Sequence, residues 1–568
     1  MIRIFKYTVM CLSLGAGICL TACSDMMDTD SELVEFVEDN NLNSPTDSVY
    51  SVMGIIHKMQ VIADRSVILG ELRGDLTAPT AYASNDLKAL ASFEVEDGNV
   101  YNNISDYYAV INNCNYFLSH IDTALVKNDK KVFEAEFAAV KAFRAWNYLQ
   151  AALVYGNIPL VTYPLLTEKE AQDALNIPYS SITDICNYFI DDIRPYVDTR
   201  LPQYGNINGR ESEKFFIPVR ALLGDLCLWA GRYSEAAAFY HDYLTLYDNP
   251  HPTMTTRIQW PNNKEFNVAP AKTMGTAYST SGTECLSYIP MELDEFKGVY
   301  SQLSNIFNST VANYHYMQAS PSKALMKLSA AQDYCLVYKI NDTRSDTLYA
   351  PKTNLSTAFT AGDLRLYAVY DISKNNQDYG SKYNSDFQRI AKVTNYGIIT
   401  YRTNVIYLRY AEALNRAGYP QSAFAVLKYG LQYKTIEKYI DAEERAAAGS
   451  LLSFDRNIFT ETNTIGIHSR GCGNSEANKF YVLPQPSEQL ATRADTVAWQ
   501  IPEVENLIID EMALETAFEG MRYYDLMRVA LRRNDASYLA RPISLRNGEV
   551  DSELYNKLMN KDNWYLKK

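Results

Sequence analysis

The sequence predicts an all-α dominated fold, in which tetratricopeptide-like helical hairpins form a scaffold and loop-rich insertions contribute a few short strands. Small and aromatic residues recur at helical spacing in three segments, residues 133–155, 216–243 and 405–431. Between the later segments the chain is rich in Gly, Ser, Thr, Asn and Pro, a composition typical of loops. We therefore expect the helical segments to stack in space, with insertions at about 249–401 and 432–505.

Residues 1–22 are predicted to be a lipoprotein signal peptide. Arg3 and Lys6 give a charged start, and the apolar stretch that follows is too short to span a bilayer as a stable anchor. Small residues precede Cys23, as the narrow site of a lipoprotein peptidase requires. We expect a lipid on Cys23, with residues 23–43 as an acidic tether, so that the protein is anchored to a membrane without crossing it. The alternative is an ordinary secretory signal with an incidental cysteine.

The helices and the first loop can be placed in chain order. Pro45 suits the first position of a helix, and apolar residues follow it at helical spacing as far as Met59. A second helix is expected over about 102–121. Residues 76–101 between the two contain Pro, Gly and several aromatic residues and are predicted to leave the helical body. Loops on a rigid scaffold commonly carry binding sites.

Short strands are expected within residues 338–401, for example at Ile398–Tyr401, where β-branched residues follow a turn-like sequence. Six cysteines remain beyond Cys23, scattered and without a CxxC pair. We interpret them as small apolar core residues, although export would permit a disulfide. They are Cys114, Cys186, Cys227, Cys285, Cys335 and Cys472.

Charge and aromatic content narrow the function. The formal net charge of −14 becomes more negative once Arg3 and Lys6 leave with the signal peptide, and an acidic body repels nucleic acid, so that partner class is excluded. The chain holds 44 tyrosines. A tyrosine offers a flat apolar face and a hydroxyl, which suits stacking on sugars or contact with peptides. The alternative is that many of them pack between helices.

Three motifs in order resemble the SusD/RagB family of outer-membrane nutrient-uptake lipoproteins. Residues 136–162 read EFAAVKAFRAWNYLQAALVYGNIPLVT, residues 408–418 read LRYAEALNRAG, and residues 510–528 read DEMALETAFEGMRYYDLMR. The resemblance covers nearly the whole mature chain. It implies that residues 44–568 form a single SusD-like domain, lipid-anchored at the outer membrane and facing the cell exterior.

The resemblance also implies a function, which is binding without chemistry. A protein of this family captures an oligomeric nutrient and acts as a hinged lid over a SusC-type TonB-dependent transporter. Family precedent favours an oligosaccharide ligand. The alternative ligand is an oligopeptide, because some relatives capture peptides and the stretches 285–290 and 468–471 look closer to that branch.

Candidate ligand contacts follow from the family's aromatic binding arc and from loop context, and for each the alternative is packing. Residues 76–101 supply Tyr82, Asn85, Phe93 and Tyr101. The insertion at about 249–401 supplies Tyr278, Tyr288, Tyr300, Tyr314 and Tyr316.

The sequence indicates no catalytic residue, metal site or cofactor. The six histidines never fall at metal-ligand spacing, and no nucleophile elbow or phosphate-binding loop is present. His468 and Ser469 are neighbours between glycines, but adjacent residues seldom orient as base and nucleophile. A surface glycosidase stays an alternative, because so many acidic residues always contain some carboxylate pair.

Charged residues in the motifs are interpreted as scaffold. Glu519, Arg522, Asp525 and Arg528 alternate in sign every three residues, so neighbours on one helix face can pair. An exposed pair contributes little stability, so we expect these residues to fix the helix register or to contact lid segments, and the alternative is a catalytic role. Residues 71–75, Glu-Leu-Arg-Gly-Asp, are interpreted in the same way.

Overall fold

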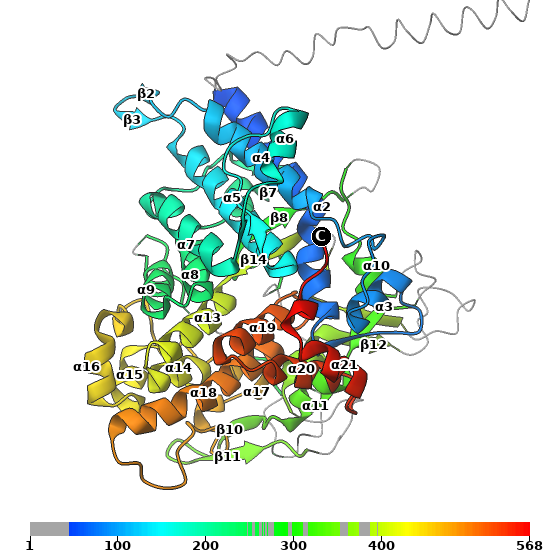
Figure 1. Cartoon of the computed structure of the whole chain (residues 1–568). Coiled ribbons are helices and arrows are strands. Elements are labelled where there is room, and N and C mark those ends of the chain that lie inside the picture. Colours follow the sequence, from blue (N-terminus) through cyan, green and yellow to red (C-terminus); the bar gives the residue numbers. More distant parts are fainter. Residues whose placement is uncertain are drawn as a thin grey trace, which may run out of the picture.

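The computed structural model describes residues 45–568 except 247, 253–255, 261–263, 265, 267–269, 271–277, 294–297, 310–315, 353–361, 374–386 and 395. Cys23, the expected tether and Tyr314 lie outside the described residues. The described chain is dominated by helices, and its named strands pair only in twos (Figure 1). The prediction of an all-α dominated fold with a few short strands is therefore confirmed.

The scaffold is a row of packed helices in which each contacts the next. The three segments with small and aromatic residues supply α5, the α8–α9 hairpin and the α13–α14 hairpin, and α9 contacts α13 although residues 245–402 separate them in sequence (Figure 1). The bounds are α4 Ser105–His120, α5 Glu134–Tyr155, α7 Ile182–Ile193, α8 Val219–Trp229, α9 Tyr233–Leu244, α13 Thr403–Arg416, α14 Pro420–Lys428 and α18 Arg493–Thr516.

Small residues allow these helices to approach closely. A Cβ atom on Gly224 of α8 would lie 2.4 Å from a ring carbon of Tyr240 on α9, so only glycine fits under that ring. The Tyr240 hydroxyl donates to Asp225 at 2.6 Å, which satisfies its polar end inside the core. The small and aromatic positions that the sequence shows thus interlock within one hairpin.

The two ends of the described chain pack against each other. Helix α2 (Pro45–Leu72) contacts α19 (Arg522–Arg533), and the blue and red ribbons lie side by side in Figure 1. The turn before α19 presses its backbone on α2, where a Cβ atom on Gly70 would lie 1.7 Å from the Gly520 carbonyl oxygen. The C-terminal helices continue as α20 Ser537–Ser544 and α21 Ser552–Leu558.

The two predicted insertions differ in structure. The first holds most of the longer strands, including the antiparallel pair of β8 (Cys285–Pro290) and β14 (Gly397–Arg402), which confirms the strand expected at Ile398–Tyr401. The second is mainly helical in its described elements, and α18 already begins at Arg493, inside the range 432–505. Its shorter helices are α15 Tyr433–Tyr439, α16 Ala442–Ala448 and α17 Ser469–Cys472.

The remaining strands form short antiparallel ribbons. β1 pairs with β9, β2 with β3, β4 with β5, β6 with β7, β10 with β11 and β12 with β13. Their bounds are β1 Thr77–Pro79, β2 Val126–Lys127, β3 Lys130–Lys131, β4 Ile158–Pro159, β5 Tyr179–Ser180, β6 Asn206–Ile207, β7 Arg210–Glu211, β9 Ala319–Pro321, β10 Cys335–Lys339, β11 Ser345–Tyr349, β12 Tyr370–Ser373 and β13 Phe387–Ile390.

Short helices complete the described chain. They are α3 Asn85–Ser92, α6 Glu168–Ala174, α10 Leu303–Phe307, α11 Lys323–Ala331 and α12 Leu364–Val369. All six cysteines beyond Cys23 are buried free thiols, which confirms their interpretation as core residues. Among the described helices, none combines the length and the apolar composition that a membrane crossing requires.

The charged motif residues correct one expectation. Glu519, Arg522, Asp525 and Arg528 are not an exposed ladder along one helix face, because the last three are at most 5% exposed and most of their partners come from elsewhere in the chain. Arg522 pairs with Asp75, Arg528 with Glu412 as well as with Asp525, and Glu519 with Lys392 and Arg402. Buried charges need such partners, so these residues join distant segments of the scaffold.

Candidate ligand-binding surface

Two exposed tyrosines stack on each other at the rim of the fold. The rings of Tyr82 and Tyr316 are 3.8 Å apart between centroids and 11° from parallel, and the two side chains are 58% and 38% exposed. The neighbouring Tyr316 side chain raises the pKa of Tyr82. Among the nine candidate contacts that the sequence predicts, the structure brings this pair together on the surface.

Strand pairing brings the two segments that carry these rings together. β1 and β9 are antiparallel with Pro79 opposite Ala319, and the same register continued by three positions sets Tyr82 against Tyr316. The backbone follows this register at least one step further, because the Thr80 N–H donates to the Gln318 carbonyl at 2.8 Å. Tyr82 itself lies in the turn that the Ala83 N–H closes by donating to the Thr80 carbonyl at 3.2 Å, so the ribbon brings the two segments together and the turn carries the ring.

Side chains hold the ends of the ribbon in place. The Thr80 hydroxyl donates to the Met317 carbonyl at 2.7 Å, and the Gln318 side chain both accepts from the Ser84 N–H at 3.1 Å and donates to the Asn305 carbonyl at 2.9 Å. Gln318 therefore connects the loop that bears Tyr82 to α10. The stacked pair sits on a braced support, which lowers the entropic cost of binding.

Helix α3 starts directly after the stacked pair. The Ser84 side chain caps it by accepting from the Leu87 N–H, and Asp86 lies in the first turn near the positive helix end. Asn85 is the first residue of this helix and is exposed. The excursion from the helical body predicted at residues 76–101 thus contains a strand, the stacked tyrosine and a short helix.

Three other candidates are half-buried beside the core. Phe93 ends α3 in the left-handed conformation, at φ 58°, and its ring lies 5.8 Å from that of Tyr523. Tyr101 packs against the core, and burial raises its pKa to about 12. Tyr300 forms an isolated backbone β-bridge with Glu292. These side chains offer a ligand less surface than the stacked pair.

Tyr278 and Tyr288 require a correction, because the structure buries both. Tyr278 is 8% exposed and lies under the cationic groups of Lys392, Arg402 and Arg470, with the Lys392 ammonium 4.0 Å from the ring centroid. Tyr288 is 3% exposed on β8 and packs edge-on against Phe215. The first ring contacts these three cations through cation–π interactions and the second fills the core, so little of either ring is open to a ligand.

The adjacent His468 and Ser469 turn to different partners. His468 bonds Glu511 at 2.7 Å and stacks on Tyr481, whereas the Ser469 hydroxyl bonds that of Ser475. Both side chains are buried. They are therefore not arranged as base and nucleophile.

His468 also lies near Asp363 and Cys472, close enough for the three to hold a metal ion by distance alone. However, both oxygens of Asp363 accept hydrogen bonds from the Arg365 guanidinium, at 2.6–3.1 Å. Arg365 further pairs with Glu511 and Glu515. We interpret the three residues as part of a buried ion network, which comprises the paired charges around Arg365, Glu511 and Glu515. Each charge in this network already has its partner.

Comparison with known proteins places the fold. No family model and no curated protein matches the sequence, but solved structures do. A SusD superfamily protein from Bacteroides vulgatus is 14% identical over 92% of this chain and 95% of its own, with a TM-score of 0.55. A SusD-like protein from Bacteroides fragilis is 17% identical over 88% of each chain, with a TM-score of 0.53.

A third similar structure carries a functional name. It is a Bacteroides vulgatus protein named as a candidate sugar binding protein, 16% identical over 86% of this chain and 87% of its own, with a TM-score of 0.51. Identities this low define the fold and leave the ligand open. The chain has the SusD-like fold that its three sequence motifs predict.

Proposed function

We propose that this chain is a cell-surface nutrient-binding lipoprotein that captures oligosaccharides and delivers them to a SusC-type TonB-dependent outer-membrane transporter. The observation that carries the proposal is the exposed stack of Tyr82 and Tyr316 on a braced ribbon. The SusD-like fold supports it, as does the name of one similar structure, a candidate sugar binding protein.

The stack suits a sugar for physical reasons. A pyranose ring has an apolar face of C–H groups, which loses little by leaving water when it lies on an aromatic ring. Hydroxyl groups at the edge of the sugar need hydrogen-bond partners, and the exposed Asn85 amide and the two tyrosine hydroxyls lie on the same rim. The binding energy then comes from stacking and hydrogen bonds, without any bond-making step.

The proposed topology follows the sequence. Residues 1–22 are removed as a signal peptide, Cys23 carries the lipid, and residues 23–43 tether a single domain of residues 44–568 outside the outer membrane. The lipid-anchored domain would hinge over the transporter and enclose the ligand there. The protein would thereby raise the local concentration of a nutrient at the transporter mouth.

An oligopeptide ligand for the same lid role is the alternative. The stretches that favoured it in the sequence are buried, because residues 285–290 form β8 in the core and residues 468–471 lie in the ion network. They are therefore unsuited to contact a peptide directly. A surface glycosidase is a further alternative, and it predicts shortened products.

One set of measurements on the purified mature chain separates these functions. Native gels cast with starch, xylan, galactan, mannan or polygalacturonate report retardation by a bound polysaccharide, and mass spectrometry reports co-purifying peptides. The proposal expects retardation by at least one polysaccharide, with no shorter product after incubation. Co-purifying peptides without any retardation would replace the sugar by a peptide, and shortened chains would make the protein an enzyme.

A further inference from the structure

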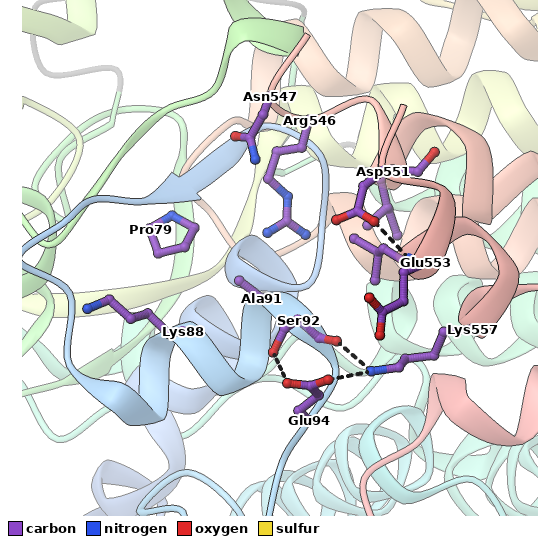
Figure 2. A pocket seen from close by; sticks show the side chains of 13 residues that line it. Pro79, Lys88, Ala91, Ser92, Glu94, Arg546, Asn547, Asp551, Glu553 and Lys557 are labelled. Atoms are coloured by element: carbon purple, nitrogen blue, oxygen red, sulfur yellow. Dashed lines mark hydrogen bonds and ion pairs between the residues drawn. The ribbon is translucent and has the colours of Figure 1, made fainter. Parts of the chain in front are cut away.

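A pocket of about 360 Å³ lies where residues 79–94, which include α3, meet the C-terminal residues 543–557 (Figure 2). One wall consists of Pro79 and residues of α3, and the other consists of residues 543–557, from the end of α20 into α21. This volume is at the lower end of the range of about 300–1,000 Å³ that small-molecule sites occupy. The charged residues that line it are Lys88, Glu94, Arg546, Asp551, Glu553 and Lys557.

Arg546 is a buried cation in this wall without a hydrogen-bond partner. Arg546 is 4% exposed, and its buried Nε and Nη2 atoms donate no hydrogen bond to a carboxylate or carbonyl oxygen. In Figure 2 the guanidinium points into the space between Pro79, Ala91 and Asp551. A buried arginine normally binds a carboxylate, so the missing partner is a feature that needs an explanation.

Other buried arginines of the chain show what is missing. Arg522 donates to both oxygens of Asp75, and Arg528 donates to both oxygens of Glu412. These partners raise the pKa of both guanidinium groups, whereas burial lowers the pKa of Arg546 to about 10. The environment of Arg546 thus lacks one negative charge at hydrogen-bond distance.

The neighbouring acids are already engaged or lie at the mouth of the pocket. Asp75 is occupied by Arg522, and Asp551 accepts from the Leu554 N–H at 3.0 Å as the cap of α21. Glu94 binds Lys557 at 3.1 Å across the pocket. Glu553 is exposed. None of them reaches the Arg546 guanidinium with a hydrogen bond.

We propose that this pocket binds a small molecule through a single carboxylate, which the charge of the Arg546 guanidinium attracts and which Arg546 holds with a charge-assisted hydrogen bond. The polar lining and the volume suit one sugar ring with a carboxylate, or the carboxyl end of a short peptide. The inference does not rest on the proposed function, because the stacked tyrosines lie outside this pocket.

The test compares acids with neutral counterparts on the mature chain. The probes are D-glucuronate and D-galacturonate against D-glucose and D-galactose, and N-acetylglycylglycine against its amide, each measured by isothermal titration calorimetry. We expect at least one acid to bind at least tenfold more tightly than its neutral counterpart. Binding by a uronate only, or by the peptide acid only, identifies which source of the carboxylate the pocket takes.

Variants make the test specific to Arg546. Arg546→Gln should weaken the acid at least tenfold, whereas Arg541→Gln, an exposed arginine of α20 that does not line the pocket, should leave its dissociation constant unchanged. A circular dichroism melt shows whether each variant is folded, and Arg546→Met, which removes an unpaired buried charge, provides a second folded variant that should not bind. Equal affinity for acid and neutral probe, or full binding by folded Arg546→Gln or Arg546→Met, would overturn the inference.

Discussion

Asp75 and Arg522, 447 positions apart in the chain, form a bidentate ion pair in the interior. The Arg522 Nε and Nη2 atoms donate to the two carboxylate oxygens at 2.6 and 2.9 Å, and both side chains are nearly inaccessible to water. Beside them the Gly520 N–H donates to Glu71 at 2.9 Å. The Glu-Leu-Arg-Gly-Asp segment at the end of α2 and the Glu-Gly-x-Arg segment before α19 therefore form one joint between the chain ends.

Breaking this ion pair should destabilise the fold. Arg522→Met leaves Asp75 charged and buried, and we expect the free energy of unfolding in urea to fall by about 3–5 kcal/mol. Arg522→Met combined with Asp75→Leu should recover part of that loss, because the uncompensated charge is gone. If the double variant is as unstable as the sum of the two single variants, the pair does not act as a unit.

The same joint should make stability depend on pH through Glu71. Burial raises the pKa of Glu71 to about 7, although hydrogen bonds from Gly520 and Thr77 oppose the shift. The pKa of Glu71 in the unfolded chain is about 4.3. Between that pKa and the folded pKa, folding takes up a proton. The stability that this uptake contributes is lost as the pH rises through 7. Between about pH 5 and pH 7.5 the parent chain should lose about 2 kcal/mol relative to Glu71→Gln, which does not titrate. Parallel pH profiles for the two proteins would contradict this assignment.

Close contact at the turn before α19 gives a test of the backbone packing. Gly520 has φ +82°, and a Cβ atom there would lie 2.2 Å from the Ser66 carbonyl oxygen. We expect Gly520→Ala to lower the free energy of unfolding by about 3 kcal/mol, through strain and displacement of α2. Gly54→Ala in α2 is the control, because a Cβ atom on Gly54 would meet open space. That substitution should raise the stability by about 0.5–1 kcal/mol, and a similar loss at both positions would argue against a specific contact.

Much of the scaffold could be predicted from the sequence because it depends on local periodicity. The spacing of small residues predicts α5, the α8–α9 hairpin and the α13–α14 hairpin, and Pro45 marks the start of α2. The sign alternation at Glu519–Arg528 was visible as well, but not its burial. The spacing of residues within one helix cannot predict which charged residue of a distant segment will form an ion pair with it. The distant ion-pair partners here are Asp75, Lys392, Arg402 and Glu412.

The candidate site could be predicted only in part. Loop context identified Tyr82 and Tyr316 as candidates, whereas their stacking depends on the pairing of β1 with β9, which joins residues more than 230 positions apart. The same context also selected Tyr278, which the structure places beneath three cations. Arg546 had no signal beyond the turn-forming Asn547-Gly548 that follows it, because an unpaired buried charge is a property of the assembled fold.

Anchoring through Cys23 can be tested in cells. Cys23→Ala removes the thiol that the lipid requires, so the variant should leave the membrane fraction and lose any label from a fatty acid supplied to the culture. The control is Cys19→Ala, which alters the signal sequence without removing the predicted lipidation site. A Cys23→Ala variant that still sediments with the membranes and carries lipid label would show that the predicted anchor is wrong.

The most direct measurement of the central claim compares three tyrosine variants with the parent chain. Isothermal titration with an oligosaccharide from whichever polysaccharide retards the protein should give a dissociation constant at least tenfold weaker for Tyr82→Ala and for Tyr316→Ala, a loss of about 1.4 kcal/mol each. Tyr179→Ala, which removes a ring on β5 that is also 58% exposed, should bind like the parent. Unchanged affinity in folded Tyr82→Ala and Tyr316→Ala would contradict the claim that the stacked pair binds the nutrient.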